Sequence, residues 1–189
     1  MELTRVVDDI ADALVAIDSS RVGFKAFQPG VGPYGEPQLV RALAQQLNRR
    51  APYNGLAVTK RTPDLLIKGH WALEFKIARP FGDNGNQAEN WSVNLLHPYE
   101  GNVSAIGDCL RLLALATPER KAVVVVGYEH TPPQISLTPL LRAFEVIAEH
   151  VASVRLGEQV RVARQGLVNP VHHQLTVARW EVLSRTTKG

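Results

Sequence analysis

The spacing of apolar residues over the first fifty positions predicts two amphipathic helices. In residues 2–17 the apolar side chains recur at helical intervals, at Leu3, Val7, Ile10, Leu14 and Ile17. A second helix is expected to begin at Glu36, because Pro37 suits the first helical turn. Its apolar stripe consists of Leu39, Val40, Leu43, Ala44 and Leu47. Residues 21–35 hold four glycines and two prolines and predict an irregular connection.

Short apolar runs over residues 56–77 predict two β-strands. Lys68-Gly69-His70 interrupts these runs and predicts a tight hairpin. Residues equidistant from Gly69 face one another across such a pair, so Asp64 is expected opposite Glu74. Side chains alternate along a strand, and Lys76 is therefore expected on the same sheet face as Glu74. The pattern places two carboxylates and one amine side by side.

The rest of the chain predicts further helices and strands after a long loop. Residues 78–101 are rich in Asn, Gly and Pro, and loops of this length are usually functional or mobile. Helices are predicted over residues 102–116 and 138–150, and strands over residues 123–126, 159–163 and 174–183. We therefore expect an α/β fold, with a central mixed β-sheet flanked by helices, in a single domain covering residues 1–189.

Composition narrows the class of protein. Of the 189 residues 45% are hydrophobic, which is enough for a substantial core. The longest apolar stretch, residues 122–127, is far shorter than the roughly 20 residues of a membrane-spanning helix. The single cysteine, Cys109, cannot form an internal disulfide, and the N-terminal residues do not resemble a secretory signal. We expect a cytoplasmic protein without a membrane partner, and a formal charge of +3 permits an anionic one.

Two neighbouring carboxylates and an amine suggest metal-assisted chemistry. A divalent cation between Asp64 and Glu74 would remove their repulsion and favour both ionised forms. Mg²⁺, with Mn²⁺ as a substitute, prefers oxygen ligands and is commonly held by one or two carboxylates together with substrate phosphate. Such a metal lowers the pKa of a bound water, while Lys76 could hold that water or the phosphate. The alternative interpretation is a solvated strand pair in which Lys76 makes an ordinary surface salt bridge.

Pro63-Asp64, followed after nine residues by Glu74-Phe75-Lys76, resembles the signature of the PD-(D/E)xK nuclease superfamily. The resemblance covers residues 36–77 and identifies no subfamily. It implies a restriction-endonuclease-like three-layer fold, a divalent metal at Asp64 and Glu74, and Lys76 as the third catalytic residue. Many members add an acid from an earlier helix, and Glu36 best fits that catalytic, metal-binding position. The glutamine-and-tyrosine motif of the exonuclease branch has no clear match here, which favours an endonuclease.

Five basic residues are candidates for binding the nucleic-acid backbone. They are Arg41, Arg49, Arg50, Lys60 and Arg61. Such side chains displace counterions and supply most sequence-independent affinity for DNA, although a solvated surface explains them equally well. The leading hypothesis is a Mg²⁺-dependent endonuclease of double-stranded DNA, for which twofold symmetry suggests a homodimer. The alternative is a catalytically inactive nucleic-acid-binding or protein-interaction module with the same fold.

Two other site types are disfavoured by the sequence. Cys109 lies among apolar residues of a predicted helix, where a thiol usually acts as a small hydrophobe rather than as a nucleophile. The histidines, including the adjacent His172 and His173, show no zinc-like spacing with cysteines. Neither a cysteine nucleophile nor a zinc centre is therefore expected.

Overall fold

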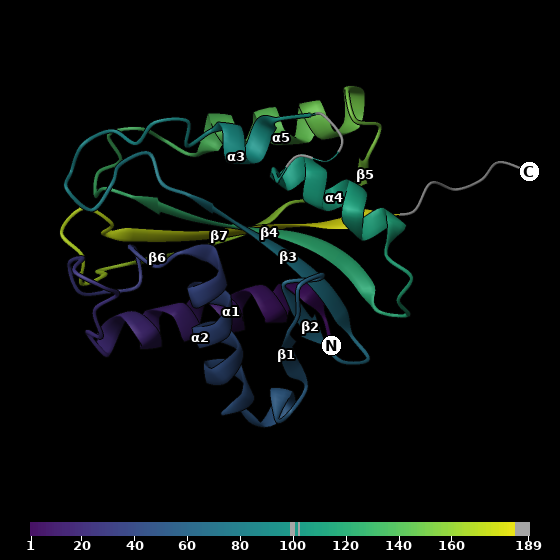
Figure 1. Ribbon diagram of the computed structural model, residues 1–189, viewed down its shortest axis with the longest axis horizontal. Helices are drawn as coiled ribbons and strands as arrows, with labels where there is room; N and C mark the ends of the chain where they lie inside the picture. Colours follow the sequence, from purple (N-terminus) through teal and green to yellow (C-terminus); the bar gives the residue numbers. More distant parts are fainter. Residues whose placement is uncertain (99–100, 102, 184–189) are drawn as a thin grey trace, which may run out of the picture.

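A mixed β-sheet forms the middle layer of the computed structural model, which describes residues 1–98, 101 and 103–183 (Figure 1). Its strands are β1 (Ala57–Thr59), β2 (Leu65–Ile67), β3 (Trp71–Ala78), β4 (Arg120–Glu129), β5 (Arg155–Leu156), β6 (Val160–Gln165) and β7 (Gln174–Leu183). The order along the sheet is β1-β2-β3-β4-β7, and both β5 and β6 pair with β7. Strands β3 and β4 are parallel, whereas the other described pairings are antiparallel.

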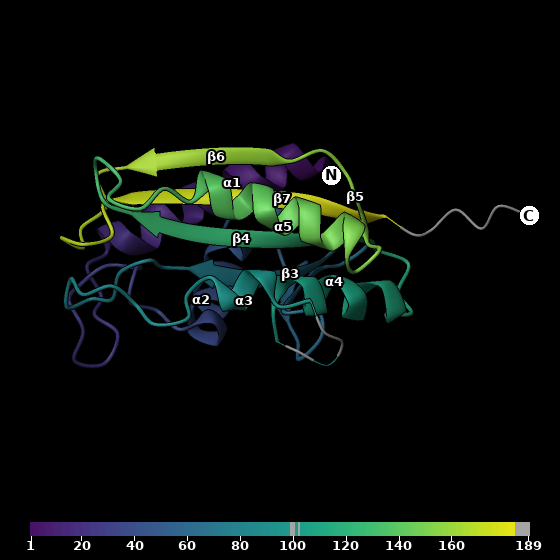
Figure 2. The same cartoon turned by 90° about the horizontal axis from the view of Figure 1, so that it is seen from above.

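Helices cover both faces of this sheet (Figures 1 and 2). One face carries α1 (Leu3–Ser19) and α2 (Glu36–Asn48), and a short 3-10 helix, Ala51–Tyr53, follows α2. The other face carries α3 (Val93–Leu96), α4 (Ala105–Ala114) and α5 (Thr138–His150). Each face has its own hydrophobic core: Val124 and Val126 of β4 point into the first, and Val123 and Val125 into the second. Burial on both faces explains the unbroken apolar run in β4.

The predicted helices and the hairpin are confirmed. Strands β2 and β3 pair with Leu65 opposite Leu73 and Ile67 opposite Trp71, which is the register expected for a turn at Gly69. Gly69 has φ +72°, a left-handed conformation that glycine adopts without a steric penalty. The α/β class, with a mixed sheet flanked by helices, is confirmed as well.

Three expectations about local structure were wrong or incomplete. The loop predicted over residues 78–101 contains α3 and a β-bridge between Phe81 and Gln87, since four helical residues are too few for a recognisable apolar period. Residues 56–77 form three strands instead of two, because β1 pairs separately with β2. Strand β5 was not predicted, because two residues are too few to show an alternating pattern. The predicted start of the third long helix, Asn102, lies outside the described residues.

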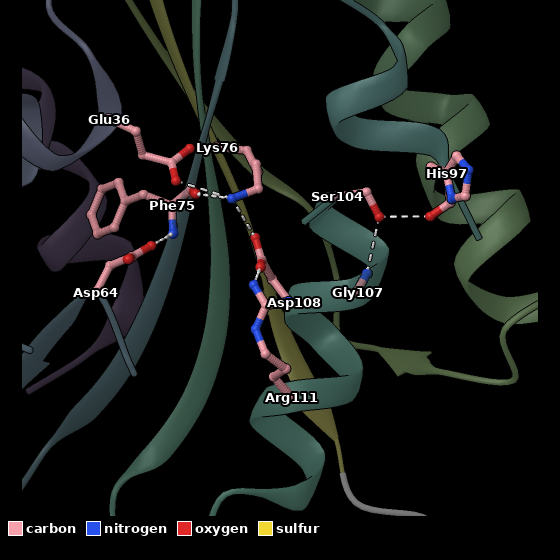
Figure 3. Close-up of polar contacts among 9 residues, drawn as sticks. All are labelled: Glu36, Asp64, Phe75, Lys76, His97, Ser104, Gly107, Asp108 and Arg111. Carbon is pink, nitrogen blue, oxygen red and sulfur yellow. Dashed lines mark hydrogen bonds and ion pairs between the residues drawn. The ribbon is translucent and has the colours of Figure 1, made fainter. Parts of the chain in front are cut away.

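A side-chain hydrogen bond stabilises the start of α4. Ser104 precedes the helix, and its hydroxyl oxygen accepts a hydrogen bond from the Gly107 backbone N–H (3.1 Å) (Figure 3). The same hydroxyl donates to the His97 carbonyl and so joins the helix to the preceding segment.

Among the described residues, no helix is both long and apolar enough to cross a membrane.

The packing of α5 on β7 generates a test of this architecture. Phe144 is fully buried, and its ring centroid lies 4.8 Å from that of Trp180. Phe144→Ala is expected to lower the free energy of unfolding by about 3–5 kcal/mol, because it removes buried apolar surface and leaves a cavity. Val146→Ala, at a 56% exposed position of the same helix, should change it by less than about 0.5 kcal/mol. Equal effects of the two changes in urea denaturation would contradict this packing.

Candidate catalytic and metal-binding site

The candidate site lies where β3 extends past the end of β2. Strand β2 pairs only with residues Trp71 to Leu73, so β3 has no β2 partner from Glu74 onward. Asp64 was predicted within the first strand, but it lies just before β2. Its carboxylate Oδ2 accepts a hydrogen bond from the Phe75 backbone N–H at 2.8 Å (Figure 3). A side-chain oxygen thus takes the position that a ladder carbonyl would occupy, and this brings Asp64 beside Glu74.

Glu74 is almost completely buried at 2% exposure. Its Oε1 atom accepts no hydrogen bond from any described residue. Burial raises the pKa of Glu74 to about 8, and a hydrogen bond to Asp64 and the charge of Asp64 add to this shift. Glu74 therefore keeps its proton near neutral pH. Burial and a neighbouring acid both favour the neutral form of a carboxyl group.

Lys76 projects from the same sheet face as Glu74, as predicted from strand alternation. Its Nζ atom donates to Glu36 Oε1 at 3.0 Å and to the Phe75 carbonyl at 3.1 Å. It also lies 2.9 Å from Oδ2 of Asp108, an ion pair outside hydrogen-bond geometry (Figure 3). The ammonium therefore connects α2, β3 and α4, although only 7% of the residue is exposed.

Glu36 joins the cluster from the first residue of α2. The side chain is 29% exposed, the most open of the groups around Lys76 Nζ. Burial raises the pKa of Glu36, the Lys76 charge and hydrogen bond oppose that rise, and the Asp64 charge adds to it. The 3.0 Å contact with Lys76 Nζ brings Glu36 beside the lysine with which it was predicted to act.

Asp108 is a site residue that the sequence interpretation missed. It lies in α4, it is fully buried, and it forms ion pairs with Lys76 and with Arg111. A signal was present, because Asp108 interrupts the apolar face formed by Ile106, Cys109 and Leu112. An acid on the buried face of a helix requires a cationic or hydrogen-bonding partner.

The structure gathers three of the five predicted basic residues near the acids. Arg41, Lys60 and Arg61 line a hollow of about 350 Å³ together with Asp64. Arg49 and Arg50 do not join them: Arg49 donates to Gln46, and Arg50 pairs with Asp9 at 2.7 Å. Both follow the last residue of α2, whereas Arg41 lies in the first half of that helix. The basic hollow is therefore smaller than the sequence suggested.

The donor set fits a hard divalent cation in part. Among the described residues, no three acidic, histidine or cysteine side chains are arranged to hold one ion. Magnesium, however, is commonly bound by one or two carboxylates, with water and phosphate completing the shell. Asp64 and Glu74 supply such a pair, and the buried Oε1 of Glu74 lacks a donor. These two residues fit the ion, and Glu36 reaches the same cluster through its contact with Lys76.

Cys109 packs as a core residue next to Asp108. It is fully buried on α4, and burial raises the pKa of its thiol. A thiol in this environment is a poor nucleophile, which agrees with its predicted role as a small hydrophobe.

No family model, curated protein or solved structure matches this chain. The resemblance to the PD-(D/E)xK superfamily therefore rests on the residues Pro63-Asp64 and Glu74-Phe75-Lys76.

The raised pKa of Glu74 generates a prediction about stability. The pKa of Glu74 is about 8 in the folded protein, whereas an ordinary glutamate, as in the unfolded chain, has a pKa of 4.5. The folded protein therefore binds this proton more tightly than the unfolded chain does. The resulting stabilisation is complete below pH 4.5 and is lost as the pH rises through about 8. In EDTA, the wild type should therefore lose stability relative to Glu74→Gln between about pH 5 and about pH 9, by a few kcal/mol. Parallel pH profiles in urea denaturation would contradict the assignment.

The buried charge of Asp108 generates a second prediction. Asp108→Ala leaves Lys76 and Arg111 without this carboxylate and should lower the free energy of unfolding by about 3–5 kcal/mol. Arg111→Ala should cost less, because the Arg111 side chain is 40% exposed and solvent screens its charge. Thermal and urea unfolding of the two variants would measure the difference. A smaller loss for Asp108→Ala than for Arg111→Ala would exclude a central role for this acid.

Proposed function

We propose that this protein is a metal-dependent DNA endonuclease of the PD-(D/E)xK type. The observation that carries the proposal is the Asp64–Glu74 pair, with one buried, unpartnered carboxylate oxygen, beside the Lys76 ammonium. Opposed acids and a lysine at a strand edge suit hydrolysis of a phosphodiester bond, in which negative charge builds on phosphate oxygens.

The restriction-endonuclease-like fold is part of this proposal. It is supported by a mixed sheet between two helical layers and by a hairpin, β2–β3, that carries the signature. The first acid precedes the hairpin strand β2, while the second acid and the lysine lie together on β3. The acid from the preceding helix, Glu36, reaches the same lysine.

Asp64 and Glu74 are the residues that would hold Mg²⁺, with Glu36 as a further candidate ligand. When bound, the metal supplies charge neutralisation at phosphate and lowers the pKa of a water molecule. Lys76 orients the attacking water or a phosphate oxygen. An incoming phosphate competes with Glu36 for the ammonium, because Glu36 is its most exposed partner. Asp108 stays buried on the opposite side of Nζ and keeps Lys76 positioned.

The basic hollow provides a binding surface for the DNA backbone. Arg41, Lys60 and Arg61 share it with Asp64, so a phosphate bound there lies next to the proposed metal ligand. Contacts of this kind weaken as salt concentration rises, because binding releases condensed counterions. The proposed endonuclease should therefore bind DNA less tightly in high salt, without a requirement for a particular sequence.

Cleavage by matched variants tests the proposal. Purified protein is incubated with supercoiled plasmid and Mg²⁺, and nicked and linear products are quantified. Asp64→Asn and Lys76→Met should reduce the rate by about a hundredfold or more, because each removes a group that acts on the developing charge. Glu149→Gln and Lys68→Met remove comparable groups at exposed positions outside the site and should cleave like the wild type.

The controls separate the proposed chemistry from the alternative function. Equal cleavage by wild type and both site variants would exclude this active site. DNA binding by a wild-type protein that never cleaves, with Mg²⁺ or Mn²⁺ and with plasmid, single-stranded and branched substrates, would identify a binding module. The three acceptors around Lys76 Nζ are the observation that favours that module, because a fully occupied ammonium suits a structural role as well.

A further inference from the structure

A second hollow, of about 320 Å³, lies at the carboxyl end of β3, and its size is at the lower end of ligand-binding pockets. Three aromatic side chains line it: Phe27, Phe81 and Trp91. They come from three separate segments, namely the loop before α2, the segment after β3 and the turn before α3. Phe27 is 46% exposed, although a phenyl ring is costly to leave in water. An apolar, planar partner would cover it.

The residues that line this aromatic hollow are neighbours of the candidate site along the chain. Ile77 directly follows Lys76 in β3, with its side chain on the other sheet face, and Pro33 lies in the loop that leads to Glu36. The basic hollow begins on the other side of Glu36, at Pro37, and includes Asp64. Residues next to the acids and the lysine in the chain therefore line both a basic hollow and an aromatic one. A chain of alternating phosphates and planar bases has the chemistry to fill both.

Arg79 adds a cation to the wall of the aromatic hollow. Its Nη1 atom donates to the Gly32 carbonyl at 2.7 Å, and no carboxylate among the described residues forms an ion pair with it. The nearby Asp83 is engaged elsewhere, because its oxygens accept from the Gln28 N–H and the Asn169 amide. Burial lowers the pKa of Arg79, and the charges of Tyr128 and Asp83 oppose that shift. A phosphate would add the ion-pair partner that this guanidinium lacks among the described residues.

We propose that the aromatic hollow binds one unpaired nucleotide of the strand that is cut, with its base against Trp91 and Phe27 and its phosphate at Arg79. This inference rests on the proposed nuclease function and narrows its substrate class. A base in a duplex is stacked on its neighbours and cannot enter such a hollow. The substrate is therefore single-stranded at this position, or its base is extruded there from the duplex.

The lining explains how the hollow accepts a base. Base–aromatic stacking tolerates any sequence, because every base has a π-face. At the rim, the Asn94 amide can donate and accept hydrogen bonds, and the Glu89 carboxylate can accept from an exocyclic amino group. These groups allow a preference among bases to be superimposed on general stacking.

The test compares binding of two fluorescein-labelled oligomers of about eight nucleotides, oligothymidylate and an abasic oligomer with the same phosphates. EDTA prevents metal-dependent cleavage, and fluorescence anisotropy gives the Kd. The wild type should bind oligothymidylate about 5- to 100-fold more tightly than the abasic oligomer, the range expected for stacking of a single base. Trp91→Leu should lose most of this preference, whereas Trp91→Phe, which keeps a ring, should retain most of it.

Trp91 also packs against the core beside α3–α5, so Trp91→Leu could weaken binding by disturbing the fold. A second variant separates that effect from the loss of base stacking. Phe27→Leu alters an exposed ring and should reduce the preference in the same direction, with an unchanged melting temperature. Equal affinity of the wild type for both oligomers would overturn the proposal. So would a preference that survives Trp91→Leu and Phe27→Leu, or thymidine monophosphate binding as tightly as the oligomer, which would indicate a site for free nucleotides.

These binding measurements are independent of the nuclease activity. A base preference that depends on Trp91, in a protein that never cleaves, would establish the nucleotide site and reject the nuclease. Plasmid cleavage that depends on Asp64 and Lys76, with no effect of Trp91→Leu on binding, would retain the nuclease and reject the nucleotide site. A fully paired hairpin of equal charge should bind more weakly than oligothymidylate, because extruding a base costs unstacking energy. Tighter binding of the hairpin would overturn the proposal.

Discussion

The candidate site depends on the ion pairs that the buried ammonium of Lys76 makes with two carboxylates. The ammonium holds carboxylates from α2 and α4, which belong to opposite helical layers, against a strand of the central sheet. Without that positive charge, the carboxylates of Glu36 and Asp108 would repel each other. Such repulsion is far stronger in a region of low dielectric constant than in water. The lysine therefore determines both the local stability and the arrangement of the acids.

The late start of β2 creates the space in which this arrangement forms. A β2 that began before Leu65 would pair with β3 beyond Leu73 and would bury the edge where Asp64 and Glu74 meet. Because β2 begins only at Leu65, Asp64 satisfies the Phe75 N–H with a side chain, and the edge remains open to the basic hollow. The start of this strand thus positions an acid and provides access at the same place.

The sequence predicted the parts of the fold and site that depend on short-range patterns. Apolar periodicity located the long helices, and the turn at Gly69 gave the register that brings Asp64 near Glu74. Asp108 was missed because its partner, Lys76, is distant in sequence and only tertiary packing joins them. Arg49 and Arg50 do not line the hollow of the other three predicted basic residues, and charge along the chain did not reveal that Arg50 pairs with Asp9. The short helix α3 offered too few residues for any periodic signal.

The residues that violate the patterns of their own elements are the ones that meet at the site. Glu74 and Lys76 occupy a strand that is otherwise apolar and buried, and Asp108 occupies the apolar face of a helix. Each exception is unfavourable by itself, because transferring a charge from water into a protein interior requires a compensating partner. Together they compensate one another only partly, since Glu74 keeps an unpartnered oxygen and a raised pKa. That unpartnered oxygen is the observation that the proposed metal site would explain, because a bound cation would satisfy it.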